Sequence, residues 1–207
     1  GLKKDSLMLH WHQEEPFLSA SIYLQWCVAR LAKENNVTVL LDGQGADELL
    51  AGYQYYFKTR QLDLIDQGYF DVAMKETQAF NGRLISASDG YEKPERRFNA
   101  QVAFSNEEIA SLIQKKKARG GSKDQKALGA ENSDLRRILF DAVTYNSLPM
   151  LLRYADRNSM AFSREARLPF LDYEFADLCM SLPDDAYIRD GWQKRILREC
   201  AAGIVPE

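Results

Sequence analysis

The chain has 207 residues, of which 45% are hydrophobic and 28% are charged, a balance that excludes a disordered, collagen-like or disulfide-built protein. Its 27 lysines and arginines are outnumbered by 30 aspartates and glutamates, which gives a net charge of −3. A nucleic-acid-binding protein usually carries a basic excess, so the composition does not favour that class.

The N-terminal part of the chain predicts a long helix followed by a buried strand. Residues 16–36 place Ile22, Trp26 and Ala29 on one stripe at helical spacing. Residues 37–42, with the sequence VTVLLD, are β-branched and almost continuously apolar. Such a run is typical of a parallel strand that is buried on both faces.

Glycines follow this strand, and helices dominate the rest of the chain. Gly43 and Gly45 predict a turn, after which residues 46–60 predict one helix. The order helix, strand, turn, helix indicates a doubly wound α/β domain. Further helices are expected at about 61–79, 105–118 (with Ser105 and Glu108 as a capping box), 135–143, 149–162, 172–181 and 192–202. The glycine- and lysine-rich residues 118–133 predict a surface loop.

The loop from Asp42 to Glu48 is the first candidate site. It follows a predicted buried strand, and in open α/β sheets ligands bind beyond the carboxyl ends of the strands. Its glycines allow the backbone to approach an anion, but Asp47 and Glu48 would repel a phosphate unless a metal ion lay between them. Because Mg²⁺ bridges carboxylates and phosphates, these residues indicate a Mg²⁺–polyphosphate site. The alternative is a tight glycine turn with two carboxylates that only complement the helix dipole.

Residues 156–172 form a second candidate region, in which charged and large apolar side chains alternate closely. We expect these charges to be partly buried and therefore paired. Glu165 and Arg167 are expected to pair with each other, with Asp156 or with Arg157. A structural ion-pair network explains this pattern at least as well as a binding site does.

Three weaker signals have simpler explanations. Lys194 and Arg198 are spaced to share one helical face, where the lysine could neutralise a phosphate, although a solvated face is the more common case. His10 and His12 would share one face of a strand, but no third metal ligand is evident near them. Cys27 lies among apolar residues and is expected in the core.

Three long segments carry a resemblance to a known family: VTVLLDGQGADELLAGYQYYF, LLRYADRNSMAFSREARLPFLDYEFADLCMSLP and GWQKRILREC. In this order they resemble the signatures of the glutamine-hydrolysing asparagine synthetase family, from about residue 16 to the C-terminus. The resemblance implies a mostly helical segment of an ATP-pyrophosphatase domain, which is adenine nucleotide alpha-hydrolase-like and doubly wound with few parallel strands. We expect residues 1–207 to form one partial synthetase domain.

The family resemblance also implies a reaction. Mg-ATP would activate the carboxylate of aspartate as an acyl-adenylate and release pyrophosphate, and ammonia would then form the amide of asparagine. Glutamine would supply the ammonia through an N-terminal glutaminase domain. The expected assembly is a homodimer that binds neither nucleic acid nor membrane.

The same resemblance implies which residues would bind the nucleotide and its metal ion. Asp42 and Gly43 would contact the ATP nucleoside, and Gly45 belongs to the same loop. Asp47 would hold Mg²⁺ on the pyrophosphate, and Lys194 would stabilise the departing pyrophosphate. Metal and cationic groups are needed where negative charge develops in this transfer.

The acceptor side of the expected site differs from the family pattern. Glu165 and Arg167 would shape the acceptor pocket, with Arg167 also assisting in ATP binding. The family loop reads SGEGADE, whereas Asp42 replaces its serine and Gln44 its glutamate. Glutamine cannot take up a proton, so Gln44 would only hydrogen-bond the acceptor. Another acid, such as a sugar acid or a β-amino acid, is therefore the alternative acceptor.

The sequence lacks two features of the complete family. It has no N-terminal cysteine nucleophile of a glutaminase domain and no SGGxDS pyrophosphate loop. We therefore expect a fragment that by itself binds ATP weakly and has no catalytic activity. A non-catalytic helical interaction module is the remaining alternative, although Asp47, Glu48 and Lys194 argue against it.

Composition and segment lengths also predict where the protein resides. Its three cysteines include no CxxC pair, which fits a reducing compartment. The sequence contains no apolar run of the roughly 18 residues that span a bilayer and no signal-peptide core. We therefore expect a cytoplasmic protein.

Overall fold

The computed structural model describes residues 1–17, 19–87, 104–118 and 133–205, with the side chains of 84–87 excepted. The chain divides into two compact units, and each is described by itself. Unit 1 consists of Gly1–Gly45 and Asp141–Ala176, and unit 2 of Ala46–Phe140 and Asp177–Glu207. Nearly all of the loop expected at 118–133 lies outside the described residues.

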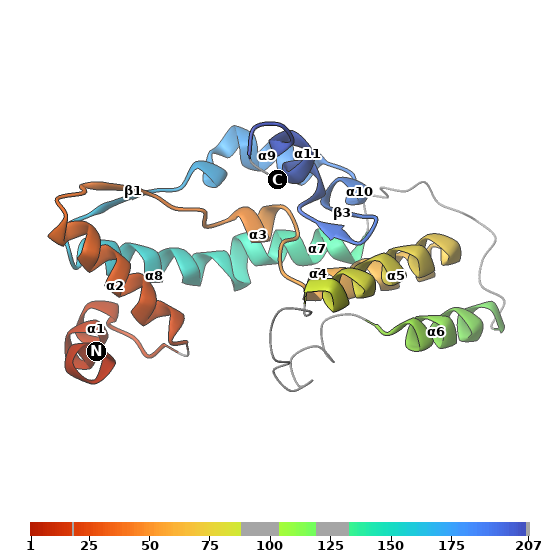
Figure 1. Cartoon of the computed structure of the whole chain (residues 1–207), viewed down its shortest axis with the longest axis horizontal. Helices are drawn as coiled ribbons and strands as arrows, with labels where there is room; N and C mark the ends of the chain where they lie inside the picture. Colours follow the sequence, from red (N-terminus) through yellow and green to blue (C-terminus); the bar gives the residue numbers. More distant parts are fainter. Residues whose placement is uncertain (18, 88–103, 119–132, 206–207) are drawn as a thin grey trace. The chain divides into compact units, whose positions relative to one another are not determined.

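Unit 1 is a small parallel sheet with helices, as Figure 1 shows. Its elements are α1 (Leu2–Gln13), α2 (Ser21–Glu34), β1 (Val39–Leu41), the π-helix η2 (Ala142–Asn146), α8 (Leu148–Met160), β2 (Glu165–Arg167) and the 3-10 helix η3 (Pro169–Leu171). β1 and β2 are parallel although they are far apart in sequence, with Val39 opposite Glu165 and Leu41 opposite Arg167. α8 packs against both α2 and β2.

The helices of unit 1 are joined by an apolar cluster and a buried amide network. The expected stripe of α2 is confirmed, because Ile22 and Trp26 are buried together with Leu9 of α1 and Tyr154 of α8. Beside this cluster, the fully buried Asn158 of α8 bonds both neighbouring helices. Its Nδ2 donates to the carbonyl of Ile22 (3.0 Å) and to Gln25 Oε1 (2.9 Å), and its Oδ1 accepts from Gln13 Nε2 (2.8 Å).

Unit 2 is mainly helical. Its elements are α3 (Ala46–Leu49), α4 (Tyr55–Asp66), α5 (Phe70–Ala87), α6 (Asn106–Ala118), α7 (Asp134–Asp141, whose last residue belongs to unit 1), α10 (Asp184–Tyr187), β3 (Ile188–Arg189), β4 (Trp192–Gln193) and α11 (Arg195–Ala201). The helix α9 (Tyr173–Ser181) belongs to unit 1 up to Ala176 and to unit 2 from Asp177 onward. β3 and β4 form an antiparallel pair.

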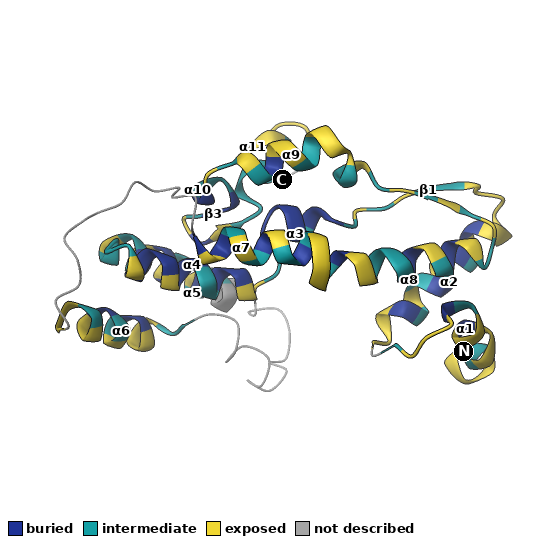
Figure 2. Cartoon of the chain, turned by 180° about the vertical axis from the view of Figure 1, so that it is seen from behind, coloured by how far each residue is buried: buried dark blue, intermediate teal, exposed yellow. Residues whose placement is uncertain are grey.

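The core of unit 2 lies where α4, α5 and α6 meet. Leu64 and Ile65 of α4, Ala73 of α5 and Ile109 and Ile113 of α6 form one buried cluster. Figure 2 shows that α6 carries exposed residues on its outer side and buried ones toward this cluster. The burial explains why so polar a segment as α6 is helical, since packing of an apolar stripe supplies most helix stability.

A capping box and a carboxylate from another helix fix the starts of α6 and α7. The predicted box is confirmed: Ser105 N–H donates to Glu108 Oε2 (2.7 Å), and Glu108 N–H donates to Ser105 Oγ (3.1 Å). At α7, the carboxylate of Asp63 in α4 accepts the N–H groups of Asp134 (3.2 Å) and Leu135 (3.0 Å). Both arrangements satisfy backbone donors that a helix start leaves free.

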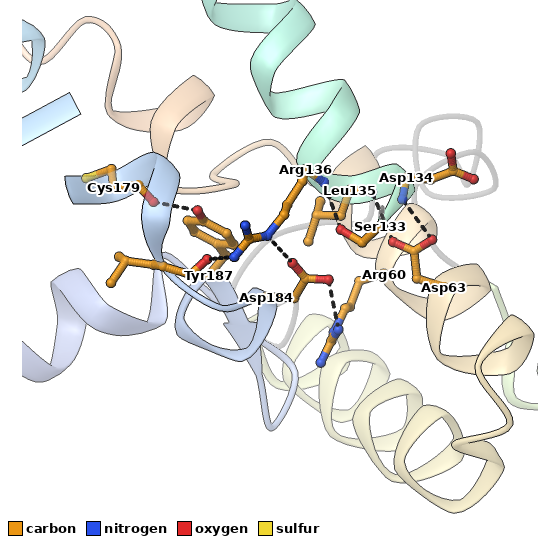
Figure 3. Close-up of polar contacts among 10 residues, drawn as sticks. Arg60, Asp63, Ser133, Asp134, Leu135, Arg136, Cys179, Asp184 and Tyr187 are labelled. Carbon is orange, nitrogen blue, oxygen red and sulfur yellow. Dashed lines mark hydrogen bonds and ion pairs between the residues drawn. The ribbon is translucent and has the colours of Figure 1, made fainter. Parts of the chain in front are cut away.

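Unit 2 also contains a buried charge network, drawn in Figure 3. Asp184 Oδ2 lies 3.4 Å from Arg60 Nη1, and its Oδ1 lies 3.3 Å from Arg136 Nε. Arg136 also donates to the carbonyl of Leu182, and Tyr187 donates its hydroxyl to the carbonyl of Cys179 (2.5 Å). Asp184 therefore links α10 to α4 and α7 through two guanidinium groups.

Several sequence expectations are corrected by the fold. The strand at 37–42 is parallel as expected, but it is not buried on both faces, since Val39 and Leu40 are half-buried and Leu41 is 76% exposed. Within the described residues, β2 pairs along one edge of β1, so the strand lacks the cover of a central sheet position. The helix expected at 61–79 is divided, because α4 ends at Asp66 and α5 begins at Phe70.

The histidine and cysteine expectations concern unit 1. His10 and His12 lie on helix α1 and not on a strand. His10 stacks on Phe17, and His12 contacts the Trp26 ring, so both serve packing. Cys27, which was expected in the core, is only partly buried and packs against the α1–α2–α8 cluster from its edge.

Candidate functional site

The loop Asp42–Gly45 begins where β1 ends. The N–H of Asp42 donates to the carbonyl of Arg167 (2.9 Å), which continues the parallel ladder by one residue. This hydrogen bond brings the end of β1 to the end of β2, as expected for the carboxyl edge of a parallel sheet. The loop therefore lies at the position where α/β sheets bind ligands.

The two glycines of this loop differ in what they require. Gly45 has φ of +91°, and a Cβ at this position would overlap the side chain of Leu171 in η3. At Gly43, no heavy atom lies within 4 Å of the place that a Cβ would occupy, so a side chain would meet open space there. Gly45 is thus needed for the turn, and Gly43 leaves room beside the backbone of the loop.

Three predicted site residues of unit 1 line three different cavities. Gln44 lines a cavity of about 360 Å³ together with Ser21, Gln25 and Tyr154. Asp42 lines another of about 260 Å³, which also reaches Asn158 and Ser159. A third, of about 480 Å³, includes Glu165. The first is large enough for a small ligand and offers amide and hydroxyl groups against an apolar wall.

Glu165 and Arg167 form the predicted ion pair, with Arg167 Nε 2.7 Å from Glu165 Oε1. Their side chains are 54% and 61% exposed, so the expectation of partly buried charges is wrong for this pair. Residues i and i+2 of a strand point to the same face, which explains both the pairing and the exposure. The carboxylate of Glu165 beside the guanidinium of Arg167 raises the already high pKa of Arg167.

Two other arginines of residues 156–172 make structural contacts, Arg157 an ion pair and Arg164 hydrogen bonds to backbone carbonyls. Arg157 Nη2 lies 2.7 Å from Glu14 Oε2, at the end of α1. Arg164 donates to the carbonyls of Val37 (2.9 Å) and Phe162 (3.0 Å) and so fixes the entry into β2. These contacts hold the strand pair in place and use the arginines structurally.

In unit 2, Asp47 and Lys194 are brought together from opposite ends of the sequence. Lys194 Nζ lies 2.9 Å from Asp47 Oδ1, with side chains 26% and 38% exposed. Glu48 is turned away into a buried position, where its Oε1 accepts the hydroxyl of Tyr53 (2.8 Å). Burial, together with the negative charges of Glu48 and Asp47, raises the pKa of the Tyr55 hydroxyl.

The helices on either side of this ion pair differ from the expected ones. The helix expected at 46–60 is interrupted between α3 and α4, because Ala51 adopts a left-handed conformation (φ +53°) and Gly52 follows. The helix expected at 192–202 begins only at Arg195, and Lys194 is its N-cap with φ of +50°. Lys194 and Arg198 therefore do not share a helical face, and the side chain of Arg198 lies over the Trp192 ring.

Sequence reasoning missed two residues beside this ion pair. Gln193 Nε2 donates to the carbonyls of Ala51 (3.1 Å) and Tyr53 (2.6 Å), and Gly52 leaves the space that Asp47 and Lys194 fill. The glycine inside an expected helix was a usable signal, because such a position commonly marks a helix end or a close approach. No local pattern marks Gln193.

Protein side chains alone do not form a metal site in the part of the chain that the structure describes, since no three His, Cys, Asp or Glu side chains gather there as a metal-binding group. A metal ion at Asp47 would therefore depend on ligands beyond a cluster of protein side chains. Among those same described residues, no helix has both the length and the apolar character that crossing a bilayer requires.

Comparison with known proteins gives a consistent result. A family model described as asparagine synthase matches residues 7–207. The chain is 29% identical over 210 residues to glutamine-hydrolyzing asparagine synthetase 1 of Bacillus subtilis, covering 95% of this chain and 33% of that protein. It is 27% identical over 208 residues to a putative glutamine-hydrolyzing asparagine synthetase of Mycobacterium tuberculosis, covering 95% and 32%. The chain thus spans about a third of the length of these relatives. No solved structure matches.

Proposed function

Because the chain belongs to the asparagine synthase family, we propose that it is part of the synthetase domain of an ATP-dependent amide-forming ligase. The proposed reaction converts aspartate to asparagine through an acyl-adenylate, with ammonia derived from glutamine. The proposed fold is that of the ATP pyrophosphatases. The observation that carries the proposal is the Asp47–Lys194 pair, a carboxylate and an ammonium group 2.9 Å apart, each from a segment that resembles a family motif.

The residues at this pair fit a Mg²⁺ ion that arrives with ATP. Mg²⁺ is usually held by one or two carboxylates and by substrate phosphates, so it needs no cluster of protein ligands. Asp47 offers one accessible carboxylate. When bound, the metal ion would neutralise charge on the phosphates and orient them. Lys194 would exchange its ion pair with Asp47 for a contact with a pyrophosphate oxygen, where negative charge develops.

The remaining predicted residues would bind the nucleoside and the acid. Asp42, Gly43 and Gly45 would contact ATP at the end of β1, where Gly43 leaves open space. Gln44 would donate its amide to the acceptor carboxylate in the cavity that it lines. Glu165 and Arg167 would act at the acceptor side, once their mutual ion pair is exchanged for contacts with the substrate. Glu165 would have a catalytic role, and Arg167 would also help to bind ATP.

A second acceptor class is supported by one observation. Gln44 stands in a largely apolar cavity with Met150, Leu151 and Tyr154, and a glutamine there offers no charge. A sugar acid or β-amino acid is therefore the alternative substrate. The proposal also includes a glutaminase domain in the same polypeptide, a homodimeric assembly and a cytoplasmic location.

The test is pyrophosphate release by the longest natural polypeptide that contains these residues, called the parent polypeptide below. Release should require Mg-ATP and an acid, with aspartate compared against other acids in the presence of ammonia. Asp47→Asn should abolish it. The matched control is Asp66→Asn, which removes the carboxylate from another exposed Asp–Lys pair of unit 2, with Lys116 at 2.7 Å, and should leave the rate unchanged. Release with only a different acid would replace aspartate as acceptor, and no release with any acid would refute the proposal.

A further inference from the structure

The backbone around the Asp47–Lys194 pair is held in an unusual conformation on both sides. Ala51, which follows α3, has φ of +53°, and Lys194, which precedes α11, has φ of +50°. Left-handed conformations are unfavourable for residues with a Cβ and persist only where surrounding contacts impose them. Such positions gather at functional sites, and the surrounding contacts are what keep the backbone in this conformation.

The side chain of Gln193 is the contact that joins the two segments. Its Nε2 donates one hydrogen bond to the carbonyl of Ala51 (3.1 Å) and another to the carbonyl of Tyr53 (2.6 Å). A glutamine amide has two N–H donors, so both are used on this single turn. Because Lys194 is the next residue, the backbone that carries the ammonium group is fixed to the segment that follows Asp47.

Gly52 sets the distance between the same two side chains. Its N–H donates to the carbonyl of Asp47 (2.9 Å), which closes the turn after α3. A Cβ on Gly52 would overlap both Asp47 Oδ1 and Lys194 Cε. These atoms belong to side chains that can move, so a methyl group here would displace the ion pair and would not require the backbone to shift.

Tyr53 completes the arrangement by selecting which carboxylate faces the lysine. Its hydroxyl donates to Glu48 Oε1 (2.8 Å), and Glu48 is 1% exposed. Its backbone carbonyl accepts from Gln193 at the same time. One segment of three residues therefore holds Glu48 inward, contacts Gln193 and makes room for Asp47 and Lys194.

From these contacts we propose that Gln193 and Gly52 are positioning residues for the contact between the Lys194 ammonium group and Asp47. Gln193 holds the backbone next to Lys194 against the turn that follows Asp47, and Gly52 leaves the space in which the two side chains meet. The functional consequence rests on the proposed function: the two groups would be placed, before substrate binds, where pyrophosphate departs as the acyl-adenylate forms. Preorganised groups act most strongly on the transition state, and small displacements of such groups are costly. Neither residue needs to touch the substrate.

Zero-length crosslinking tests this placement without reference to activity. A water-soluble carbodiimide joins a carboxylate to an amine only when the two are in contact, and the Asp47–Lys194 amide is then identified by mass spectrometry. In the parent polypeptide, Gln193→Met and Gly52→Ala should each lower its yield by more than half, and Asp47→Asn should abolish it. The matched controls are Gln114→Ala, at an exposed position of α6, and Gly82→Ala, where a Cβ meets nothing within 4 Å. Both controls should retain the wild-type yield.

Enzyme kinetics supply the second readout. If the proposed function holds, Gln193→Met and Gly52→Ala should lower kcat for pyrophosphate release by about 10- to 100-fold while KM for ATP changes much less. Absence of release in the wild type would refute the proposed function and leave the crosslinking result intact.

Wild-type crosslinking in either variant would overturn the role assigned to that residue. Loss of folded structure in both variants, measured by circular dichroism, would also overturn it, because both residues would then be general requirements for folding and not positioning residues.

Discussion

The Asp184 carboxylate lies 3.4 Å from Nη1 of Arg60, and both side chains are only 1% exposed. Arg136 approaches the other carboxylate oxygen of Asp184 at 3.3 Å. A buried ion pair of this kind adds little net stability over apolar residues, but removal of one partner leaves a buried charge without compensation. The network therefore fixes how α4, α7 and α10 meet within unit 2 (Figure 3).

Asp184→Asn should destabilise unit 2 strongly. The substitution removes the carboxylate charge that lies 3.4 Å from the buried Arg60 guanidinium and 3.3 Å from Arg136 Nε, so the free energy of unfolding should fall by about 3–5 kcal/mol. Urea unfolding monitored by circular dichroism measures this change. The neighbouring Asp185, which is 39% exposed and 3.7 Å from Arg189, provides the control. Asp185→Asn should cost about 1 kcal/mol or less, and equal effects of the two substitutions would contradict the buried-network account.

Glu76 on α5 should make stability depend on pH. Burial raises the pKa of this carboxyl from 4.5 to about 7. The positive charge of Arg60 lowers the pKa, and the negative charges of Asp190 and Asp185 raise it further. Its Oε2 has no hydrogen-bond partner among the described residues. Because the folded-state pKa is the higher one, the folded protein is favoured while Glu76 stays protonated. That advantage is complete below about 4.5 and is lost as the pH rises through about 7.

Glu76→Gln tests this linkage, because it removes the charge and nearly keeps the shape. We compare the free energy of unfolding of the variant with that of the wild type. The difference, variant minus wild type, should become more positive between pH 5 and pH 8, by on the order of 3 kcal/mol. Glu107→Gln, at an exposed position in the first turn of α6, should show no such gain. A difference between Glu76→Gln and wild type that stays constant over this pH range would show that Glu76 does not titrate there.

Asp63→Ala should remove the cap of α7. The carboxylate of Asp63 accepts the N–H groups of Asp134 and Leu135, and its loss leaves both without their partner. We expect the free energy of unfolding to fall by about 1–2 kcal/mol, as for other N-cap deletions. Hydrogen exchange should be faster at the first turn of α7. Asp66→Ala on the same helix, at an exposed side chain, is the control and should leave α7 exchange unchanged.

Gly45→Ala should be costly, and Gly43→Ala should be tolerated. Gly45 has φ of +91°, and its added Cβ would overlap Leu171, whereas a Cβ on Gly43 would meet open space. The left-handed backbone alone predicts a loss of about 1–2 kcal/mol for Gly45→Ala. Thermal unfolding of both variants measures the contrast. Equal melting temperatures would mean that the turn after β1 can rearrange freely.

Local sequence patterns predicted much of the helical structure. The stripe of Ile22 and Trp26 and the capping box of Ser105 and Glu108 depend on residues three or four positions apart, and the structure confirms both. The parallel character of the strand at 37–42 was also correct. Its burial was not, because the exposure of Leu41 depends on which elements cover the strand, and hydropathy does not report that.

The helix expected at 46–60 failed for a different reason. Gly52 lowers the helix propensity at this point, and Gln193, far away in the sequence, takes the carbonyls of Ala51 and Tyr53. A tertiary hydrogen bond replaces the local one, so the tertiary contact adds to the effect of the glycine. The same contact places Lys194 outside the helix that its spacing with Arg198 suggested.

The sequence alone determined the family, the helical character and the residues Asp47 and Lys194 as candidates, because these depend on residue identity and short-range spacing. Only the tertiary structure decided that Lys194 meets Asp47 while Glu48 turns toward Tyr53. It also decided that Glu165 and Arg167 pair on an exposed strand face. The Asp47–Lys194 contact depends on the left-handed turns at Ala51 and Lys194 and on packing between distant segments. The exposure of the Glu165–Arg167 pair depends on which elements cover β2, and no local pattern encodes either property.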